Sequence, residues 1–225
     1  MKAHATWMLW GGIVLIGYSL VAGLAGKVPQ IPILYESIRN FYYHVPMWFA
    51  MLAMFLIGVV YSLWYLSSAY PRHDHMAAAF IETGIVFGLL GLITGAIWAR
   101  YTWGAWWNND PKQNASAIVL LIYIAYFVLR HAITDASVRG RVGAVYSTFA
   151  FAVAIPLLFI LPRMTDSLHP GSGGNPAFSS YDLDYQMRLV FYPAVIGWIL
   201  FGSWLSHING CIRVRRQQLT ILQID

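Results

Sequence analysis

Charged side chains are scarce in this chain of 225 residues. Asp, Glu, Lys and Arg together make up 10% of the sequence, whereas 59% of the residues are hydrophobic and 16% are aromatic. A soluble domain has about a quarter of its residues charged. The shortage of charge therefore excludes an ordinary water-soluble fold and indicates a single membrane domain over residues 1–225.

Cysteine and two common motifs are also missing or nearly so. Cys211 is the single cysteine, which excludes an internal disulfide and a thiol-rich metal site. No Cys-x-x-Cys-His occurs, so the chain does not attach haem to itself covalently in the c-type manner. No Gly-x-x-x-x-Gly-Lys-Ser/Thr loop occurs, so any ATP hydrolysis must come from a partner chain.

Six apolar segments are long enough to cross a hydrocarbon core about 30 Å thick. An all-α fold is expected, because a backbone in lipid must satisfy its own hydrogen bonds and the alternating pattern of a β-barrel is missing. The first segment resembles a signal peptide, but its apolar run exceeds a usual signal core, so we expect it to remain as a helix. The predicted spans cover residues 7–24, 45–66, 77–98, 114–133, 142–161 and 189–207.

Three prolines fall within these spans. Pro156 is expected to kink the fifth span, because proline removes a backbone donor and crowds the preceding turn. Pro46 and Pro193 are expected in the first turns of the second and sixth spans, where proline is tolerated. The prolines are thus compatible with continuous helices over most of each span.

A few polar residues near the span ends allow more than one interpretation. Glu82 is either a functional acid inside the membrane or a charge that favours the N-terminal dipole of its helix. Arg130 is expected to snorkel toward water at the end of the fourth span. The run His73-Asp74-His75 has a metal-like spacing but is expected to be solvated in a short polar turn.

Lysine and arginine in the loops predict the orientation. With the N-terminus inside, eight of them lie on the cytoplasmic side and six outside, and the cluster just after the last span is the strongest local signal. Both termini are therefore expected in the cytoplasm, and the net charge of +5 marks topology and not a nucleic-acid surface. The cytoplasmic residues are Lys2, Arg72, Arg130, Arg139, Arg141, Arg213, Arg215 and Arg216, and the outer ones are Lys27, Arg39, Arg100, Lys112, Arg163 and Arg188.

The predicted outer loop 98–113 is crowded with tryptophan, at Trp103, Trp106 and Trp107. The ordinary interpretation is a membrane anchor, because aromatic belts place such rings at the interface. A belt, however, needs neither Gly104 among the tryptophans nor Asp110-Pro-Lys behind them. The density of the rings favours a platform for a flat apolar ligand.

Histidine narrows the choice of ligand. Of the seven histidines, only His44 and His169 are expected on the outer face. His44 precedes the second span, and His169 lies in the outer loop 162–187, which is rich in Gly, Ser and Pro. Either residue alone is most often a solvated side chain. Together with the aromatic surface, two neutral imidazoles suit a haem iron held by two axial histidines.

The two propionates of a haem require cationic partners on the same face. Arg39, Arg100 and Lys112 are expected to supply them. Two alternatives stay open. One is a membrane-bound b-type electron carrier, whose histidines usually lie on helices deep in the bilayer; the other is a small-molecule permease that uses the Trp loop as an anchor.

The order of these features resembles the CcmC branch of the haem-handling proteins of cytochrome c maturation, which are related to the CcmF and CcsA proteins. That family carries an outer loop of the form Trp-Gly-x-x-Trp-x-Trp-Asp between two histidines. The positions that match the loop are Trp103, Gly104, Trp107 and Asp110, while Trp106 is at a spacer position and Asn109 replaces the last Trp.

Two shorter segments match in the same order. Arg39 followed by His44-Val45-Pro46 resembles the run into the first axial histidine of the family, and Leu168-His169 resembles the second. The resemblance implies a protein of the bacterial inner membrane that binds haem b non-covalently as cargo and is not an enzyme. It also implies presentation at the periplasmic face, delivery to the haem chaperone CcmE, and a complex with the CcmA ATPase, CcmB and CcmD.

Overall fold

The computed structural model describes residues 5–30, 32–169 and 183–222. In this part of the chain the regular elements are helices, and six of them are long and apolar enough to cross a membrane, which confirms the predicted all-α fold. Short 3-10 and π-helical turns adjoin them: η2 (Tyr35–Asn40), η3 (Pro156–Ile160) and η4 (Leu161–Arg163). The long helices are α1 (Thr6–Ala25), α2 (Phe41–Ser68), α3 (Pro71–Trp103), α4 (Pro111–Ala132), α5 (Ala136–Ile155) and α6 (Tyr185–Leu222).

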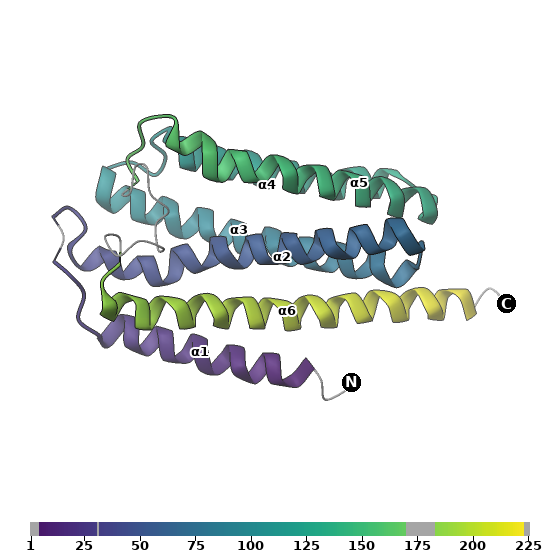
Figure 1. The fold of residues 1–225 in the computed structure, drawn as a ribbon, viewed down its shortest axis with the longest axis horizontal. Coiled ribbons are helices and arrows are strands. Elements are labelled where there is room, and N and C mark those ends of the chain that lie inside the picture. The colour runs from purple at the N-terminus through teal and green to yellow at the C-terminus, as the bar shows by residue number, and fades with distance from the viewer. Residues whose placement is uncertain (1–4, 31, 170–182, 223–225) are drawn as a thin grey trace.

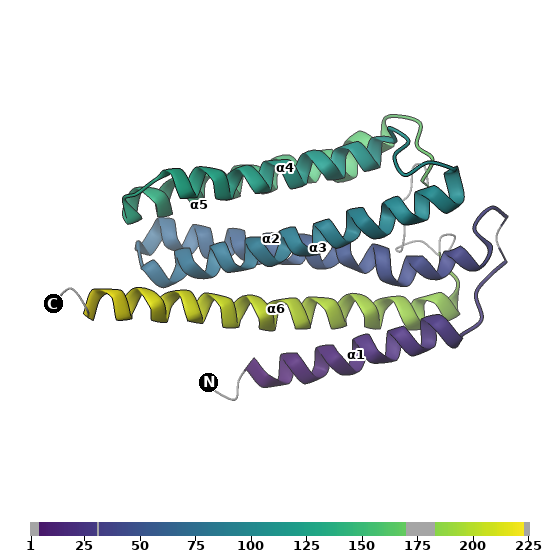
Figure 2. The same cartoon turned by 180° about the vertical axis from the view of Figure 1, so that it is seen from behind.

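The helices lie roughly along one axis and form three layers (Figure 1). Helices α2 and α3 make the central layer, α4 and α5 cover one side of it, and α6 with α1 covers the other, as the reverse view also shows (Figure 2). Helix α1 packs mainly on α6. The end of α6 lies at one end of the bundle and the α3–α4 loop lies at the other, while α1 starts part-way along α6.

The central helices α2 and α3 approach each other closely along a row of glycines on α3. The row has four glycines, and a Cβ atom added to any one of them would come within 2.8 Å of a side chain on a neighbouring helix. Small residues allow this close helix contact in membranes, where apolar surface alone gives little driving force for association. The glycines and the α2 side chains that they admit are Gly84 with Phe55, Gly88 with Met51, Gly91 with Trp48 and Gly95 with His44.

Several helices extend further than predicted. Helix α2 already includes His44, which therefore lies in its first turn and not in a preceding loop, and Pro46 lies inside the helix. Pro193 likewise lies inside α6, and Trp103 is the last residue of α3. Hydropathy marks only the lipid-buried part of a helix, whereas aromatic and polar residues at the interface continue it. At Pro156 the α-helical hydrogen bonding of α5 gives way to the π-helical turn η3.

A buried ion pair joins α3 to α4 at the end of the bundle away from the Trp loop. Arg130 donates two hydrogen bonds, of 2.6 and 2.8 Å, to the carboxylate of Asp74, and each residue is 8% exposed. The predictions of a solvated Asp74 and a snorkelling Arg130 are therefore wrong. Because α3 begins at Pro71, residues 73–75 belong to its first turn, which faces the neighbouring helices. His75 also contacts a helix, since its Nε2 lies 2.7 Å from the side-chain oxygen of Gln217.

Glu82 forms a second ion pair between helices. It lies well inside α3, so the helix-dipole interpretation is wrong. Its carboxylate accepts hydrogen bonds of 2.5 Å from Asn209 and from Arg213, both on α6. The side chain of Glu82 is 46% exposed, and its ion pair links α3 to α6.

Replacing Asp74 with Asn should lower the stability of the protein strongly. The change leaves the Arg130 guanidinium buried without a counter-charge, and breaking a buried pair in this way costs about 3–5 kcal/mol. The measurement is the thermal unfolding midpoint in detergent micelles. The control is the double variant Asp74→Asn/Arg130→Met, which removes both charges and should be less destabilised than Asp74→Asn alone. A double variant that unfolds as early as the single one, or earlier, would contradict the prediction.

Candidate haem site

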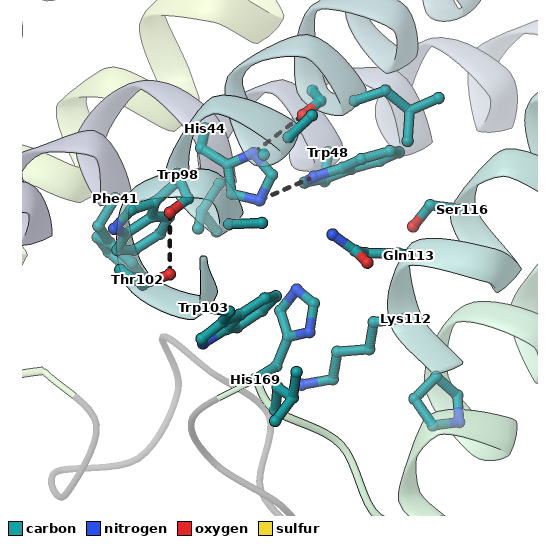
Figure 3. Close-up of a pocket in the computed structure, with 18 of the residues that line it drawn as sticks. Phe41, His44, Trp48, Trp98, Thr102, Trp103, Lys112, Gln113, Ser116 and His169 are labelled. Carbon is teal, nitrogen blue, oxygen red and sulfur yellow. Dashed lines mark hydrogen bonds between the residues drawn. The ribbon is translucent and has the colours of Figure 1, made fainter. Parts of the chain in front are cut away.

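A cavity of about 430 Å³ lies at the end of the bundle that carries the α3–α4 loop. Its walls come from α2, α3, the first turns of α4 and the segment that follows α5. Most of the lining side chains are apolar or aromatic, and a few polar ones point into the space between them (Figure 3). The volume and the lining are typical of a site for a small organic ligand or cofactor.

His44 projects into this cavity from the first turn of α2. Its Nδ1 lies 3.0 Å from the Gly91 carbonyl oxygen and 3.2 Å from the hydroxyl of Thr94. Its Nε2 lies 3.4 Å from Nε1 of Trp48. A carbonyl can only accept and an indole N–H can only donate, so both contacts require the tautomer with the proton on Nδ1. The Nε2 lone pair of His44 therefore accepts from Trp48, which also lines the cavity.

His169 enters the cavity from the segment that follows η4, and Asp110 holds its ring. The Nδ1 of His169 lies 2.8 Å from one carboxylate oxygen of Asp110. The other oxygen accepts from the hydroxyl of Ser167 at 2.8 Å and from the amide of Leu168 at 2.7 Å. Asp110 also caps α4 by accepting from the amide of Lys112. With Nδ1 engaged, the His169 ring is left with Nε2 for a ligand.

The ionisation of Asp110 follows from these contacts. Burial by itself raises the pKa of this carboxyl group, but the hydrogen bonds from His169, Ser167 and Leu168 together lower it well below its ordinary value. Asp110 is 3% exposed and is a carboxylate at neutral pH. A buried carboxylate on Nδ1 fixes the tautomer of an imidazole and makes its other nitrogen a stronger ligand.

The two histidines point into the same cavity from opposite sides, with an aromatic ring beside each (Figure 3). Trp103 packs edge-on against His169, with ring centroids 4.8 Å apart, and Trp98 packs edge-on against His44 at 5.9 Å. The arrangement therefore brings two imidazoles that are far apart in the sequence to one cavity, and each has its Nδ1 bound to an oxygen.

The three tryptophans of the loop have different environments. Trp103 and Trp107 line the cavity, and Trp107 is anchored by a 3.1 Å hydrogen bond from its Nε1 to the side chain of Asn114. Trp106 is 58% exposed and is not among the lining residues that the structure describes. Gln113 further ties the loop to α4, because its side-chain oxygen accepts from the Asn108 amide at 2.9 Å.

The backbone of the loop explains two residues of the motif. Gly104 ends α3 with φ of 83°, a left-handed conformation that favours glycine. Asn109 has φ of 53°, and asparagine is among the few other residues that adopt this region at low cost. The geometry gives a physical reason for Asn109 where the family pattern has Trp, and a Trp side chain would be strained in this backbone conformation.

The three cations that were predicted as partners for the haem propionates do not all lie at the cavity. Lys112 lines the cavity, but Arg39 and Arg100 are not among its described lining residues. Arg39 pairs with Glu36 at 2.8 Å and donates to two carbonyls at the end of α1, while Arg100 donates to the carbonyl of Gly104. Arg163, which the sequence analysis assigned only to topology, does line the cavity. Residues 170–182 of the predicted outer loop lie outside the described part of the chain.

Trp48 is the main residue that the sequence analysis missed. It lies four residues after His44 on the same helix, and its N–H contacts the His44 ring. Residues at this spacing share one face of a helix, so the pair was visible in the sequence. Hydropathy assigned Trp48 to the lipid-embedded part of the second span and gave no reason to connect it with a site.

The fold and the cavity define a polytopic helical membrane protein with paired histidines in an aromatic cavity at one end. The family described as heme exporter protein C matches residues 1–223, and the chain belongs to this family. The heme exporter protein C of Bradyrhizobium diazoefficiens is 31% identical over 83% of this chain and 72% of its own length. Those of Rhodobacter capsulatus and Escherichia coli K12 are 30% and 25% identical, over 80% and 89% of this chain and 75% and 79% of their own lengths.

Replacing Asp110 with Asn should weaken the binding of haem, the ligand implied by the family resemblance. An amide offers one acceptor oxygen where the carboxylate offers two, so at least one bond to the 167–169 segment is lost and His169 is held less firmly. Loss of such an outer contact typically costs about 10- to 100-fold in affinity. The measurement is titration of the purified protein with ferric haem.

Asp135→Asn is the matched control for this change. Asp135 caps α5 through a 2.8 Å bond from the Val138 amide, as Asp110 caps α4, but it lies at the other end of the bundle. Its replacement should cost some stability and leave haem affinity unchanged. Equal affinities for the two variants would show that Asp110 acts only as a helix cap.

Proposed function

We propose that this protein binds haem b non-covalently in the described cavity, as cargo for cytochrome c maturation, with His44 and His169 as the axial ligands of the iron. The observation that carries the proposal is the state of the two imidazoles. Both rings point into the same cavity, and each has its Nδ1 engaged by an oxygen, so that Nε2 is the nitrogen left for an iron. Two neutral imidazoles on one iron are a common haem arrangement.

The rest of the cavity supports a porphyrin between these ligands. Trp103, Trp107 and Trp98 offer aromatic surface for a flat apolar ring, and Trp106 is placed to act at the outside of the loop. Lys112 and Arg163 supply positive charge at the cavity wall for the two propionates. Arg39 and Arg100 are better understood as residues that hold η2 and the end of α3 in place.

The location of the cavity suits the transfer of haem to another protein. It lies at one end of the helix bundle, and one ligand is borne by the segment after η4, where a partner can approach. The names of the relatives describe them as heme exporters. We infer a place in the bacterial inner membrane, with the cavity at the periplasmic face, delivery to CcmE, and association with CcmA, CcmB and CcmD, of which CcmA would hydrolyse ATP.

The b-type electron carrier is the main alternative, and His44 on a helix is a feature that it shares. A carrier that moves electrons across a bilayer needs its redox groups distributed over the membrane thickness. Here the two candidate ligands gather at one end of the bundle. The geometry therefore favours presentation of haem at one surface over electron transfer through the membrane.

Replacing either His44 or His169 with Ala should convert bound haem from a six-coordinate low-spin spectrum to a five-coordinate high-spin one and reduce its retention. Each change removes one axial nitrogen. The measurement is the absorption spectrum of the purified protein, together with the haem delivered to CcmE in cells that contain the remaining maturation proteins. His73→Ala and His131→Ala are controls that should keep the wild-type spectrum. A normal low-spin spectrum in either outer-histidine variant would remove that residue from the site.

The proposed orientation predicts the compartment reported by two tags. A reporter fused after Asp225 should lie in the cytoplasm, because the arginine cluster at 213–216 closely follows the last span. A reporter inserted after Gly173, between η4 and α6, should lie in the periplasm. The measurement uses a phosphatase that is active only outside and a fluorescent protein that is active only inside. Activity of the same reporter at both sites would refute the proposed arrangement.

A further inference from the structure

The Nε2 lone pair of His44 has a partner in the structure. Trp48 donates its indole N–H to this atom over 3.4 Å, while Nδ1 is bound to the Gly91 carbonyl. The nitrogen that an iron would use is thus the one that Trp48 occupies. Any ligand that binds His44 through Nε2 must first replace the Trp48 hydrogen bond.

Trp48 is held in this position by the packing of α2 on α3. Its ring lies over Gly91, where an added Cβ atom would come 2.8 Å from the indole ring. Its ring is also edge-on to the His44 imidazole, with an interplanar angle of 83°. The space that Gly91 leaves on α3 therefore holds the Trp48 indole N–H next to Nε2 of His44.

The bond itself is long. Hydrogen bonds from N–H groups in proteins usually join atoms 2.7–3.2 Å apart and weaken beyond that range. A contact of 3.4 Å satisfies a half-buried lone pair at low cost and can be given up readily. A metal–nitrogen bond would replace it with a stronger one.

We propose that Trp48 is a positioning residue that occupies the His44 Nε2 lone pair in the empty site and is displaced when haem iron binds. The inference rests on the proposed function. Binding is then an exchange of one partner of Nε2 for another, without any change of oxidation state or transfer of a proton. On release of haem the indole N–H takes the lone pair back, so Trp48 helps the cargo to leave.

The test compares two Trp→Phe variants with opposite expected behaviour. Trp48 and Trp98 both pack edge-on against His44, but the N–H of Trp98 donates to the Ser37 hydroxyl at 3.1 Å and not to the imidazole. Both replacements shrink an aromatic side chain beside His44. Only Trp48→Phe removes the competing donor.

The measurement is the rate at which ferric haem leaves the purified protein for an excess of apomyoglobin. Trp48→Phe should keep a low-spin spectrum and release haem roughly two- to five-fold more slowly, which corresponds to the loss of one weak competing hydrogen bond. Trp98→Phe reduces the aromatic surface proposed for the porphyrin without removing a donor to His44, so it should release haem at least as fast as the wild type. If Trp48→Phe does not fold, Trp48→Leu serves the same purpose, because leucine has neither a hydrogen-bond donor nor an atom that can bind iron.

The direction in which the rate of haem release changes distinguishes the possible outcomes. If Trp48 merely packs against His44, its replacement should loosen the imidazole, so release at an unchanged or faster rate would overturn the inference. Slower release in both variants would also overturn it, since the N–H would not be the cause. A wild-type protein that takes up no low-spin haem would instead refute the proposed function, and the inference with it.

Discussion

Helices α2 and α3 can approach closely only because α3 has no side chains at the four glycines that face α2. The same gaps determine where the α2 side chains lie. Gly95 leaves room for the ring of His44, Gly91 leaves room for Trp48, and the Gly91 carbonyl accepts a hydrogen bond from His44 Nδ1. The packing of α2 on α3 and the orientation of His44 thus depend on the same contacts, and a side chain added to the glycine row would disturb both.

On the other side of the cavity, Asp110 likewise combines a role in helix structure with the orientation of a histidine. One carboxylate ends the tryptophan loop, begins α4 and holds His169, so three parts of the chain meet at one buried charge. Asp110 was predicted as part of a motif, but the sequence does not show which histidine it contacts. The two residues are 59 positions apart, and only the fold brings them together.

The number of spans and the gathering of His44, Trp103 and His169 at one end could be predicted from the sequence, because hydropathy counts the crossings and the crossings determine which loops share a face. The helix ends could not, since interfacial residues such as those around His44 continue a helix beyond its apolar core. Of the three cations predicted as partners for the propionates, Lys112 lines the cavity, whereas Arg39 and Arg100 are not among its described lining residues. Loop position assigns Arg39 and Arg163 to the same side, whereas side-chain direction, set by local hydrogen bonds, separates them.

The bond between His169 and Asp110 has a consequence for the synthesis of the protein. A chain is made from its N-terminus, and its early parts can fold before the later ones emerge. Helices α2 and α3, with His44 and the tryptophan loop, are complete long before residue 169 is added. A nascent or prematurely ended chain that stops within α5 can build the first half of the cavity, yet it has no second imidazole. Under the proposed function such a chain would lack one of the two axial ligands and would compete only weakly with the finished copies for haem.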